Sequence, residues 1–303
     1  AVFALQSFDN SPEEKIFEAP VSLGEVVYAV PLRKKIPLET VRQEWYHEYI
    51  DGFANDSLFK PLFEKVRDKS LTVYFPEYPF TEKMNPDSAI AMIDIPFSYP
   101  YEDVNTFEII YMIGTETMYP ESVVAIIFHE EWMYDAATLS LKKVVKGIIP
   151  VLDYGQVYID GMYYNNLKPS FYIPFPGSTE QKSDFTLNEI TYDMQNDSVG
   201  LSDYLTSYRC VSQASTKSPD GSRITTELVA SLKMQCAVKT NGLFGGNYPF
   251  NIPIAKKEKP SVLAAVDSTR LLRFHETWSA DFTSMTFTKN VRGVLLGSEF
   301  GQA

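Results

Sequence analysis

Residues 128–135 read Phe-His-Glu-Glu-Trp-Met-Tyr-Asp, and residues 274–281 repeat the stretch as Phe-His-Glu-Thr-Trp-Ser-Ala-Asp. The spacing is 146 residues, and the same spacing separates Lys143 from Lys289. The chain therefore carries one supersecondary unit twice. Any role given to a residue of one unit must also account for its counterpart in the other.

Each unit is predicted to be a β-hairpin. Residues 123–128 are apolar and rich in β-branched residues, and the strand is expected to continue through residues 129–134. A turn follows at residues 135–138, and the chain resumes as a second strand at residues 139–151. A four-residue loop is common in hairpins and sets the register of the two strands. The predicted cross-strand pairs are Phe128–Val145, Glu130–Lys143 and Trp132–Leu141 in the first unit, and Phe274–Val291, Glu276–Lys289 and Trp278–Phe287 in the second. Aromatic–aliphatic and opposite-charge pairs of this kind each contribute roughly 0.2–1 kcal/mol, so the repeated residues are predicted to build a sheet.

The histidines of the motif are expected on the other face of that sheet. Side chains alternate along a strand, so Phe128, Glu130 and Trp132 share one face and His129 takes the opposite one. The sequence His129-Glu130 resembles the start of a zinc-binding His-Glu-x-x-His motif, but the second histidine position holds Met133. Two ligands four residues apart also require a helix, and this stretch has the pattern of a strand. No metal site is predicted.

The residues before the first unit show a strand and helices. Residues 24–30 form an apolar, β-branched run that stops at Pro31, which predicts a strand. Residues 38–49 have helical spacing, and Ser57 is a candidate N-cap for a helix that ends near Arg67. Residues 97–120 are rich in Tyr and Phe and have no clear period.

Together these patterns predict an α+β protein with two related domains, each a mainly antiparallel sheet with short packing helices. We expect an N-terminal arm at residues 1–22, a first domain at residues 23–177 and a second, shorter domain at residues 178–303. The second unit is followed by fewer residues than the first. We therefore expect the second domain to lack its closing strands and to leave an open sheet edge, which invites pairing with another chain.

Charge and hydropathy exclude two classes of partner. The formal net charge is −12, from 27 basic and 39 acidic side chains. A protein that binds the phosphate backbone needs a concentrated basic face, so no nucleic-acid partner is predicted. A membrane-spanning helix needs roughly 18 or more apolar residues in a row, and no such run occurs. No direct membrane span is predicted.

The sequence specifies no reaction. It contains no Gly-x-Ser-x-Gly elbow, no phosphate-binding Gly-x-x-x-x-Gly-Lys loop and no Cys-x-x-Cys motif. His47 lies between Glu44 and Glu48 in the first predicted helix, where a solvated charged face is a better interpretation than a catalytic base. We predict no enzyme and no cofactor, and expect the abundant aromatic side chains to serve as interaction surface.

The two cysteines, Cys210 and Cys236, leave two interpretations open. A disulfide between them would constrain the unfolded chain by roughly 3 kcal/mol and would suit an oxidising compartment. Two buried thiols are the alternative.

Seven segments of the chain together match a known pattern: residues 31–38, 57–59, 69–74, 80–82, 130–135, 145–151 and 171–176. They resemble the GldN/PorN family of the Bacteroidota type IX secretion and gliding machinery. The resemblance covers roughly residues 25–177, with a weaker second match around residues 265–297. The order and spacing of these segments make the resemblance more specific than any one of them. Because the unit recurs, the chain resembles a duplicated relative of that family.

The resemblance implies a periplasmic or outer-membrane-associated, exported, non-enzymatic component. Such a component assembles into a ring with copies of itself or with a ring-forming lipoprotein, and contacts the inner-membrane motor proteins of the same machinery. The alternative is a secreted or cell-surface module, such as an adhesin or glycan-binding domain, for which exposed Tyr and Trp in a groove would be the sign. A hydrolase would need two carboxylates, or a histidine and a nucleophile, converging in a pocket.

Overall fold

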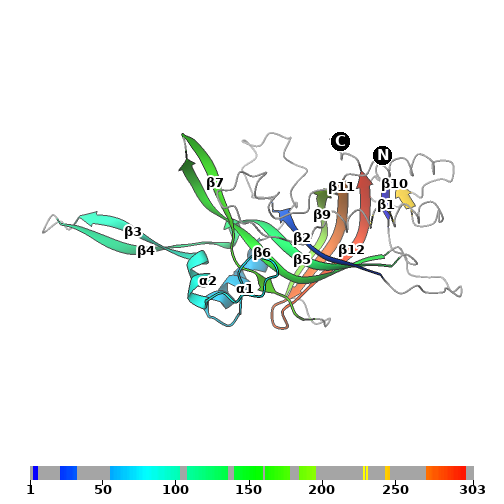
Figure 1. Ribbon diagram of the computed structural model, residues 1–303, viewed down its shortest axis with the longest axis horizontal. Coiled ribbons are helices and arrows are strands. Elements are labelled where there is room, and N and C mark those ends of the chain that lie inside the picture. The colour runs from blue at the N-terminus through cyan, green and yellow to red at the C-terminus, as the bar shows by residue number, and fades with distance from the viewer. Residues whose placement is uncertain are drawn as a thin grey trace.

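The structure is a computed structural model that describes residues 3–5, 21–32, 55–102, 108–135, 140–159, 161–177, 184–195, 228, 230, 243–245 and 271–297. Within these residues one large antiparallel sheet dominates, with two short α-helices beside it (Figure 1). The strands of this sheet are β1 (Phe3–Leu5), β2 (Val21–Pro31), β5 (Val123–Asp135), β6 (Ser140–Ile159), β7 (Met162–Pro169), β8 (Ile173–Pro174), β9 (Phe185–Gln195), β10 (Leu243–Gly245), β11 (Leu271–Asp281) and β12 (Thr286–Gly297). The predicted α+β class agrees with this architecture.

The helices α1 (Asn55–Arg67) and α2 (Pro86–Ile93) follow from local sequence signals. Helix α2 begins with Asn85, whose side chain accepts a hydrogen bond from the backbone N–H of Asp87, and with a proline in its first turn. Helix α1 begins two residues before the predicted cap at Ser57 and ends at the predicted residue. Its buried face consists of Leu58, Phe59, Leu62, Phe63 and Val66.

Strand β5 is buried on both faces, which explains the continuous apolar run at residues 123–128. Phe128 and Trp132 belong to the larger cluster of buried side chains, which also contains the buried face of α1. Ile127 and Tyr172 belong to a second cluster, which lies on the other face of the strand. The predicted strands at residues 24–30 and 123–134 are confirmed as β2 and β5, which pair with each other.

The predicted hairpin register is wrong by two residues. Trp132 lies opposite Lys143, Glu130 lies opposite Val145, and Phe128 lies opposite Ile148. The shift arises because Asp135 pairs with Ser140, so the connection is displaced by one residue on each side from the one assumed. A β-bulge between His129 and Glu130 then moves the register by one more residue.

The second hairpin has the same register and the same bulge. Trp278 lies opposite Lys289, Glu276 lies opposite Val291, and Phe274 lies opposite Val294. The bulge falls between His275 and Glu276, the counterparts of His129 and Glu130. The predicted pairs Phe274–Val291, Glu276–Lys289 and Trp278–Phe287 are therefore corrected in the same way as those of the first unit.

The two hairpins join through a short ladder between β6 and β12. Lys143 lies opposite Lys289, and Val144 lies opposite Thr288. Lys143 and Lys289 are counterparts in the two units, so each unit contributes the same position to this rung. Two copies of one structure related by a twofold axis make contacts of this kind.

The flanking strands follow the same symmetry and close both sides of the second hairpin. Strand β9 pairs with β11 as β2 pairs with β5, and β1 pairs with β12 as β8 pairs with β6. The predicted open edge of the second unit is therefore wrong, because its long sides are covered by β9 on one and by β1 and β6 on the other. Residues 3–5, part of the predicted N-terminal arm, supply β1.

Both hairpins belong to one sheet, and their buried side chains form one cluster that includes Phe128, Trp132, Phe274 and Trp278. The division into related domains at residues 23–177 and 178–303 stays a prediction. The helix expected at residues 38–49, together with His47, lies outside the described residues.

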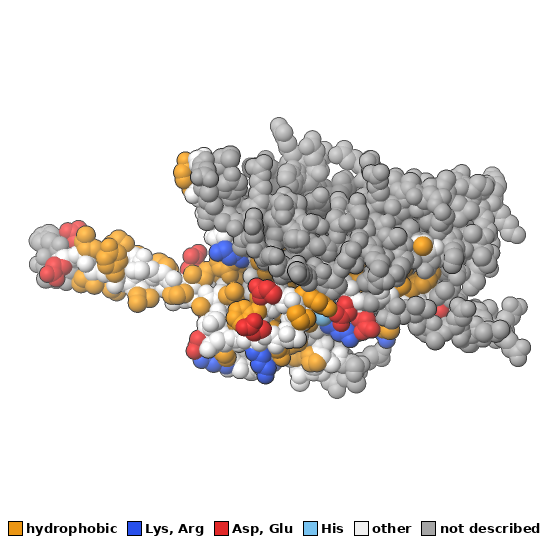
Figure 2. Space-filling model, viewed as in Figure 1, with side chains coloured by type: hydrophobic (Ala, Val, Ile, Leu, Met, Phe, Trp, Pro, Cys, Tyr) orange, Lys and Arg blue, Asp and Glu red, His pale blue; other side chains and the backbone are white. Residues whose placement is uncertain are grey.

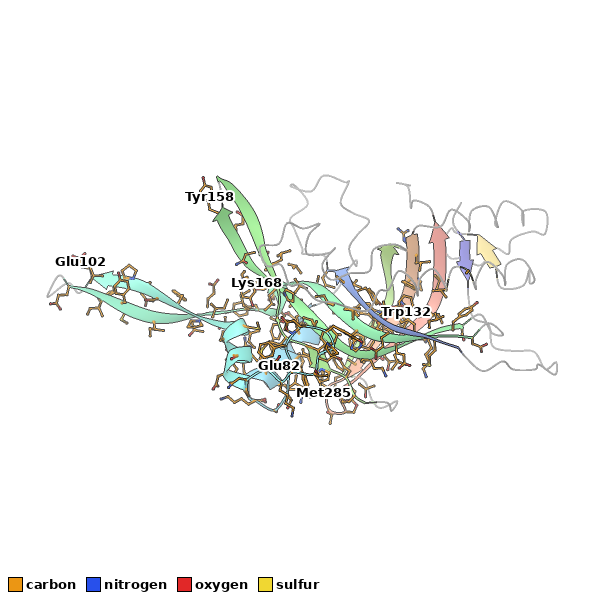
Figure 3. All side chains as sticks on the ribbon, in the orientation of Figure 1. Glu82, Glu102, Trp132, Tyr158, Lys168 and Met285 are labelled. Carbon is orange, nitrogen blue, oxygen red and sulfur yellow. The ribbon has the colours of Figure 1, made fainter. Side chains whose placement is uncertain are left out.

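Two hairpins project from this body (Figure 1). One is the end of β6 with β7, which carries the exposed Tyr158 near its tip (Figure 3). The other is formed by β3 (Asp94–Glu102) and β4 (Ile109–Thr117), which we call the ribbon. Among the described strands, β3 and β4 pair only with each other. The aromatic-rich region in which the sequence showed no period is thus largely this ribbon.

Candidate functional site

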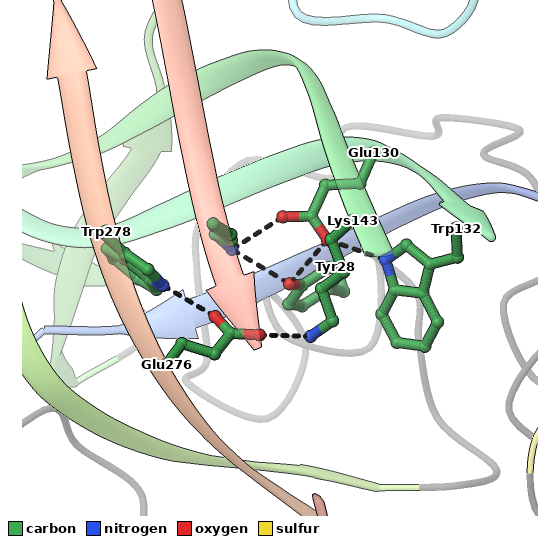
Figure 4. A network of polar contacts seen from close by, with 7 residues as sticks. Tyr28, Glu130, Trp132, Lys143, Glu276 and Trp278 are labelled. Atoms are coloured by element: carbon green, nitrogen blue, oxygen red, sulfur yellow. Dashed lines mark hydrogen bonds and ion pairs between the residues drawn. The ribbon is translucent and has the colours of Figure 1, made fainter. Parts of the chain in front are cut away.

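The eight repeated residues converge where the two hairpins meet, and Figure 4 shows the polar contacts among the charged and tryptophan side chains of this region. We call this region the junction. It contains Phe128, Glu130, Trp132, Lys143, Phe274, Glu276, Trp278 and Lys289, and all of them are buried. Four of these side chains carry charges, so the centre of the molecule is ionic.

The ion pairs of the junction run between the units. Lys289 Nζ lies 2.7 Å from Glu130 Oε1, and Lys143 Nζ lies 2.8 Å from Glu276 Oε1. The predicted pairs Glu130–Lys143 and Glu276–Lys289 are therefore wrong. The register explains the difference: within each hairpin the tryptophan, not the glutamate, lies opposite the lysine, and the hairpins pack with the two lysines on a shared rung.

Each tryptophan holds the glutamate of its own strand. Trp132 Nε1 donates a hydrogen bond of 2.7 Å to Glu130 Oε2, and Trp278 Nε1 donates one of 2.7 Å to Glu276 Oε2. Residues two apart on a strand point to the same face, which brings the indole to the carboxylate. Each carboxylate thus uses one oxygen for its own hairpin and the other for the opposite hairpin.

Each ammonium group also lies against an aromatic ring of the other hairpin. Lys143 Nζ lies 3.1 Å from the ring centroid of Phe274, and Lys289 Nζ lies 3.1 Å from that of Phe128. Each lysine also lies 4.5 Å from the indole of its own hairpin. Cation–π attraction strengthens where water is excluded, so these rings compensate part of the lost hydration.

Tyr28 of β2 adds a contact that the sequence patterns did not reveal. Its hydroxyl donates to Glu130 Oε2 at 2.9 Å and accepts from Lys289 Nζ at 3.0 Å. On β9 the equivalent position is Tyr192, which lies opposite Phe274 as Tyr28 lies opposite Phe128. A comparison of the two flanking strands by register, rather than by spacing, would have found this pair.

Burial sets the protonation behaviour of the junction. It lowers the pKa of both lysines, that of Lys289 to about 8, while the two glutamates oppose the shift. Burial alone would raise the pKa of Glu276, but Lys143, Lys289 and the hydrogen bond from Trp278 together lower it. Removing one member of a buried pair costs about 3–5 kcal/mol, whereas the intact pair often contributes little net stability. The arrangement therefore acts by specifying how the hairpins pack.

A second polar cluster lies on the opposite face of β5, as predicted for His129. His129 Nδ1 lies 3.1 Å from the Tyr172 hydroxyl, and His129 Nε2 lies 3.4 Å from Glu25 Oε2. The Tyr78 hydroxyl donates to the same Glu25 oxygen at 3.1 Å. Burial lowers the pKa of His129, although Glu25 opposes the shift. A neutral imidazole among the rings of Tyr78, Phe80 and Tyr172 serves as a packing group.

Gly147 explains one more repeated position. A Cβ atom at residue 147 would fall on the ring of Tyr172, so only glycine lets that ring lie against β6. Gly293 is its counterpart, opposite His275 as Gly147 is opposite His129. The glycine, histidine and bulge thus repeat together.

Most of the exposed large apolar side chains among the described residues lie on the ribbon (Figure 2). Ile113 is 82% exposed, Tyr111 is 70% exposed and Ile109 is 65% exposed. The sequence did carry a signal for this surface: residues 94–117 contain no Lys, Arg or His, although they include four acidic residues outside the tip segment 103–107. A long apolar stretch without basic residues is unusual for a water-facing hairpin.

The described residues contain no group of three or more His, Cys, Asp or Glu side chains that could hold a metal ion. A search of the same part of the chain for a helix long and apolar enough to cross a membrane found none. Cys210 and Cys236 lie outside the described residues, so their pairing stays a prediction.

One protein family matches the chain. A model of the family described as "Gliding motility associated protein GldN" matches residues 25–212, which is more than half of the chain. The matched segment begins in β2, includes the ribbon and the first hairpin, and runs beyond β9. No curated protein matches the chain.

Proposed function

The chain belongs to the GldN family of gliding motility associated proteins, and from that premise we propose that it is a non-enzymatic structural subunit of the envelope machinery for gliding and type IX secretion. In this role it binds partner proteins and associates with further copies of itself or with a ring-forming lipoprotein. It also contacts the inner-membrane motor proteins of the same machinery. It is exported and is periplasmic or associated with the outer membrane.

The observation that carries this proposal is the ribbon. Contiguous exposed apolar surface on a protein marks sites of interaction, and here both faces of a projecting hairpin are apolar. A subunit of an assembly needs such surfaces, while an enzyme needs a pocket with convergent polar groups. The four buried charges of the junction are each paired with a residue of the other hairpin.

The junction supports the same role in a different way. Each buried ion pair of the junction joins the two hairpins. A packing that separated the partners would leave buried charges unpaired, so one packing of the two hairpins is favoured over others. A structural subunit of an assembly requires such a fixed packing of its hairpins. The rival role of a glycan-binding module has less support, because Trp132 and Trp278 are fully buried and cannot stack on a sugar.

The test is the state of the full chain in its own cell envelope. After mild solubilisation, native mass spectrometry and electron microscopy should find the chain in a particle much larger than 34.4 kDa, together with other proteins of the machinery. A deletion strain should lose gliding or secretion of type IX cargo. A strict monomer in the envelope fraction, with secretion intact in the deletion strain, would overturn the proposal.

A further inference from the structure

The ribbon exposes apolar side chains on both of its faces. Residues directly opposite each other on two antiparallel strands share a face, so Phe97, Tyr99 and Tyr101 lie on one face with Met112 and Ile110. The other face carries Ile109, Tyr111 and Ile113. An isolated two-stranded hairpin is at best marginally stable in water. The ribbon therefore has the composition of a sheet whose faces are covered in an assembly.

The two free edges of the ribbon differ in their hydrogen-bonding capacity. Pro96 and Pro100 of β3 lie opposite Thr115 and Tyr111 and have no backbone N–H to donate. Rungs of an antiparallel ladder alternate between hydrogen-bonded and non-hydrogen-bonded pairs. The proline rungs are of the second kind, and so is the rung of Ser98 with Ile113 between them.

The consequence is that only β4 offers a complete edge. On non-hydrogen-bonded rungs the backbone N–H and C=O groups point away from the partner strand. Tyr111, Ile113 and Thr115 therefore present a full set of donors and acceptors along the free side of β4. The free side of β3 lacks a donor at both prolines, which is how proteins block an edge strand.

The charges of the ribbon are all of one sign. Glu102, Glu108 and Glu116 surround its apolar faces, and residues 94–117 contain no basic side chain. A complementary partner is therefore apolar with a basic rim. The same charges argue against insertion into a bilayer, where acidic side chains are costly and anionic lipids repel them.

The base of the ribbon is fixed to the body, so the ribbon is presented in a defined direction. Arg67, the last residue of α1, binds both oxygens of Asp94 at 3.0 Å and donates to the Met118 carbonyl at 3.4 Å. These residues stand at the first position of β3 and directly after β4. The backbone N–H of Met118 also donates to the Ile93 carbonyl at 2.6 Å.

We propose that the free edge of β4 binds an extended strand of a partner protein in which lysine or arginine residues alternate with apolar ones. The backbone of the partner strand pairs with Tyr111, Ile113 and Thr115. Because side chains alternate along a strand, its apolar side chains lie on the face of Tyr111 and Ile113, and its basic side chains lie on the other face, which carries Glu116. This inference deepens the proposed function by naming the surface and the chemistry of one partner.

The first experiment measures binding of defined peptides to the full chain by fluorescence anisotropy. The probe is a nine-residue peptide of alternating valine and lysine, and its matched control has glutamate in place of every lysine. Because the whole chain is acidic, simple charge attraction must be separated from binding at the ribbon. Two variants of the same rung do this: Ile113→Pro removes an N–H from the β4 edge, and Ser98→Pro removes one from the β3 edge.

We expect the lysine peptide to bind the wild type and Ser98→Pro equally, and to bind Ile113→Pro at least tenfold more weakly. The glutamate peptide should bind all three at least tenfold more weakly than the lysine peptide binds the wild type. The variant Ile113→Ser keeps the N–H and loses only the side chain, so it should fall between wild type and Ile113→Pro. Equal binding of the lysine peptide to wild type and Ile113→Pro would overturn the inference.

A second experiment identifies the occupant in the native cell. A photo-reactive benzoylphenylalanine at position 111 should cross-link to a partner segment that contains alternating basic and apolar residues, and Ile113→Pro should abolish the cross-link. A cross-link to a second copy of this chain would overturn the inference. The inference would also be overturned if the purified chain bound phosphatidylcholine–phosphatidylglycerol vesicles and Ile113→Ser abolished that binding. If Ile113→Pro leaves the large envelope particle and the peptide binding unchanged, the inference fails while the proposed function stands. If the peptides bind as expected but the chain is monomeric in the envelope, the proposed function fails while the inference about the β4 edge stands.

Discussion

The junction and the ribbon invert the usual distribution of side chains. The junction buries two lysines and two glutamates completely, whereas the ribbon exposes isoleucine, tyrosine and phenylalanine. Both arrangements are unfavourable when taken alone, because buried charges lose hydration and exposed apolar groups order water. In the junction the cost of burying charge is offset within the chain, since each charge meets a partner from the other hairpin. The apolar side chains of the ribbon are not covered by described residues of this chain. We therefore assign a structural role to the junction and a binding role to the ribbon.

The largest effect should come from breaking one junction pair. Lys143→Met keeps the volume but removes the ammonium group 2.8 Å from Glu276, and we expect the free energy of unfolding to fall by about 3–5 kcal/mol. Urea unfolding followed by circular dichroism would measure it. Lys142→Met, at the neighbouring exposed position of β6, is the matched control and should change little.

The double variant Lys143→Met/Glu276→Gln then sharpens the comparison. It removes both charges but keeps an oxygen to accept from Trp278, so it should recover most of the loss. The partner choice matters here: Lys143→Met/Glu130→Gln should recover less, because Glu130 belongs to Lys289. Equal recovery by the two double variants would contradict the crosswise pairing.

A smaller loss is expected from Tyr28→Phe. The hydroxyl bonds both a carboxylate and an ammonium, and hydrogen bonds to charged groups contribute about 1.5–3 kcal/mol. Tyr154→Phe is the comparison, since Tyr154 donates at 2.9 Å to the neutral Met92 carbonyl, a contact of about 0.5–1.5 kcal/mol. Thermal unfolding of both variants would rank them, and an equal loss would show that the charges near Tyr28 add nothing.

Acid should weaken the junction in a defined window. The pKa of Glu276 is lower in the folded chain than its ordinary value of 4.5, so the unfolded chain takes up its proton first. The stabilisation is complete above about pH 4.5 and is lost as the pH falls through the lower, folded-state pKa. Urea midpoints from pH 6 to pH 3 should therefore decline more steeply for the wild type than for Lys143→Met/Glu276→Gln. Parallel declines would mean that other carboxylates dominate.

The smallest effect on stability should come from the ribbon. Ile113→Ser replaces a side chain that is 82% exposed, and surface substitutions usually stay within about 0.5 kcal/mol. The same change at Ile127, which is fully buried, should cost several times more. If Ile113→Ser destabilises the isolated chain as strongly as Ile127→Ser, the ribbon is packed against the body and is not a free surface.

The sequence was informative where local rules decide the outcome. Repetition found the eight junction residues, strand alternation separated His129 from Glu130, and local patterns found α1, β2 and β5. The hairpin register was missed because a shift of one residue on each side of a turn leaves the same apolar alternation. The crosswise ion pairs depend on how two hairpins cross, which no spacing within either unit encodes.

The ribbon was missed for a different reason. Its two faces are both apolar, so the alternation of polar and apolar residues that marks a half-buried strand is absent. Phe97 also lies over Gly114, the residue on the opposite strand, so an aromatic side chain serves local packing within the ribbon. The available signal was the absence of basic residues at 94–117. This signal indicates the charge of a binding partner and does not predict a fold.

The crosswise pairing also constrains the order in which the chain can fold. The Tyr28 hydroxyl and the Lys289 ammonium are separated by 261 residues, and Lys289 is the last junction residue to be synthesised. Until the second hairpin forms, Lys143 lacks Glu276 and Glu130 lacks Lys289, the residues with which they form ion pairs. The first half must therefore stay open until the second arrives, so this centre of the molecule closes last and slowly, as expected for contacts of high sequence separation.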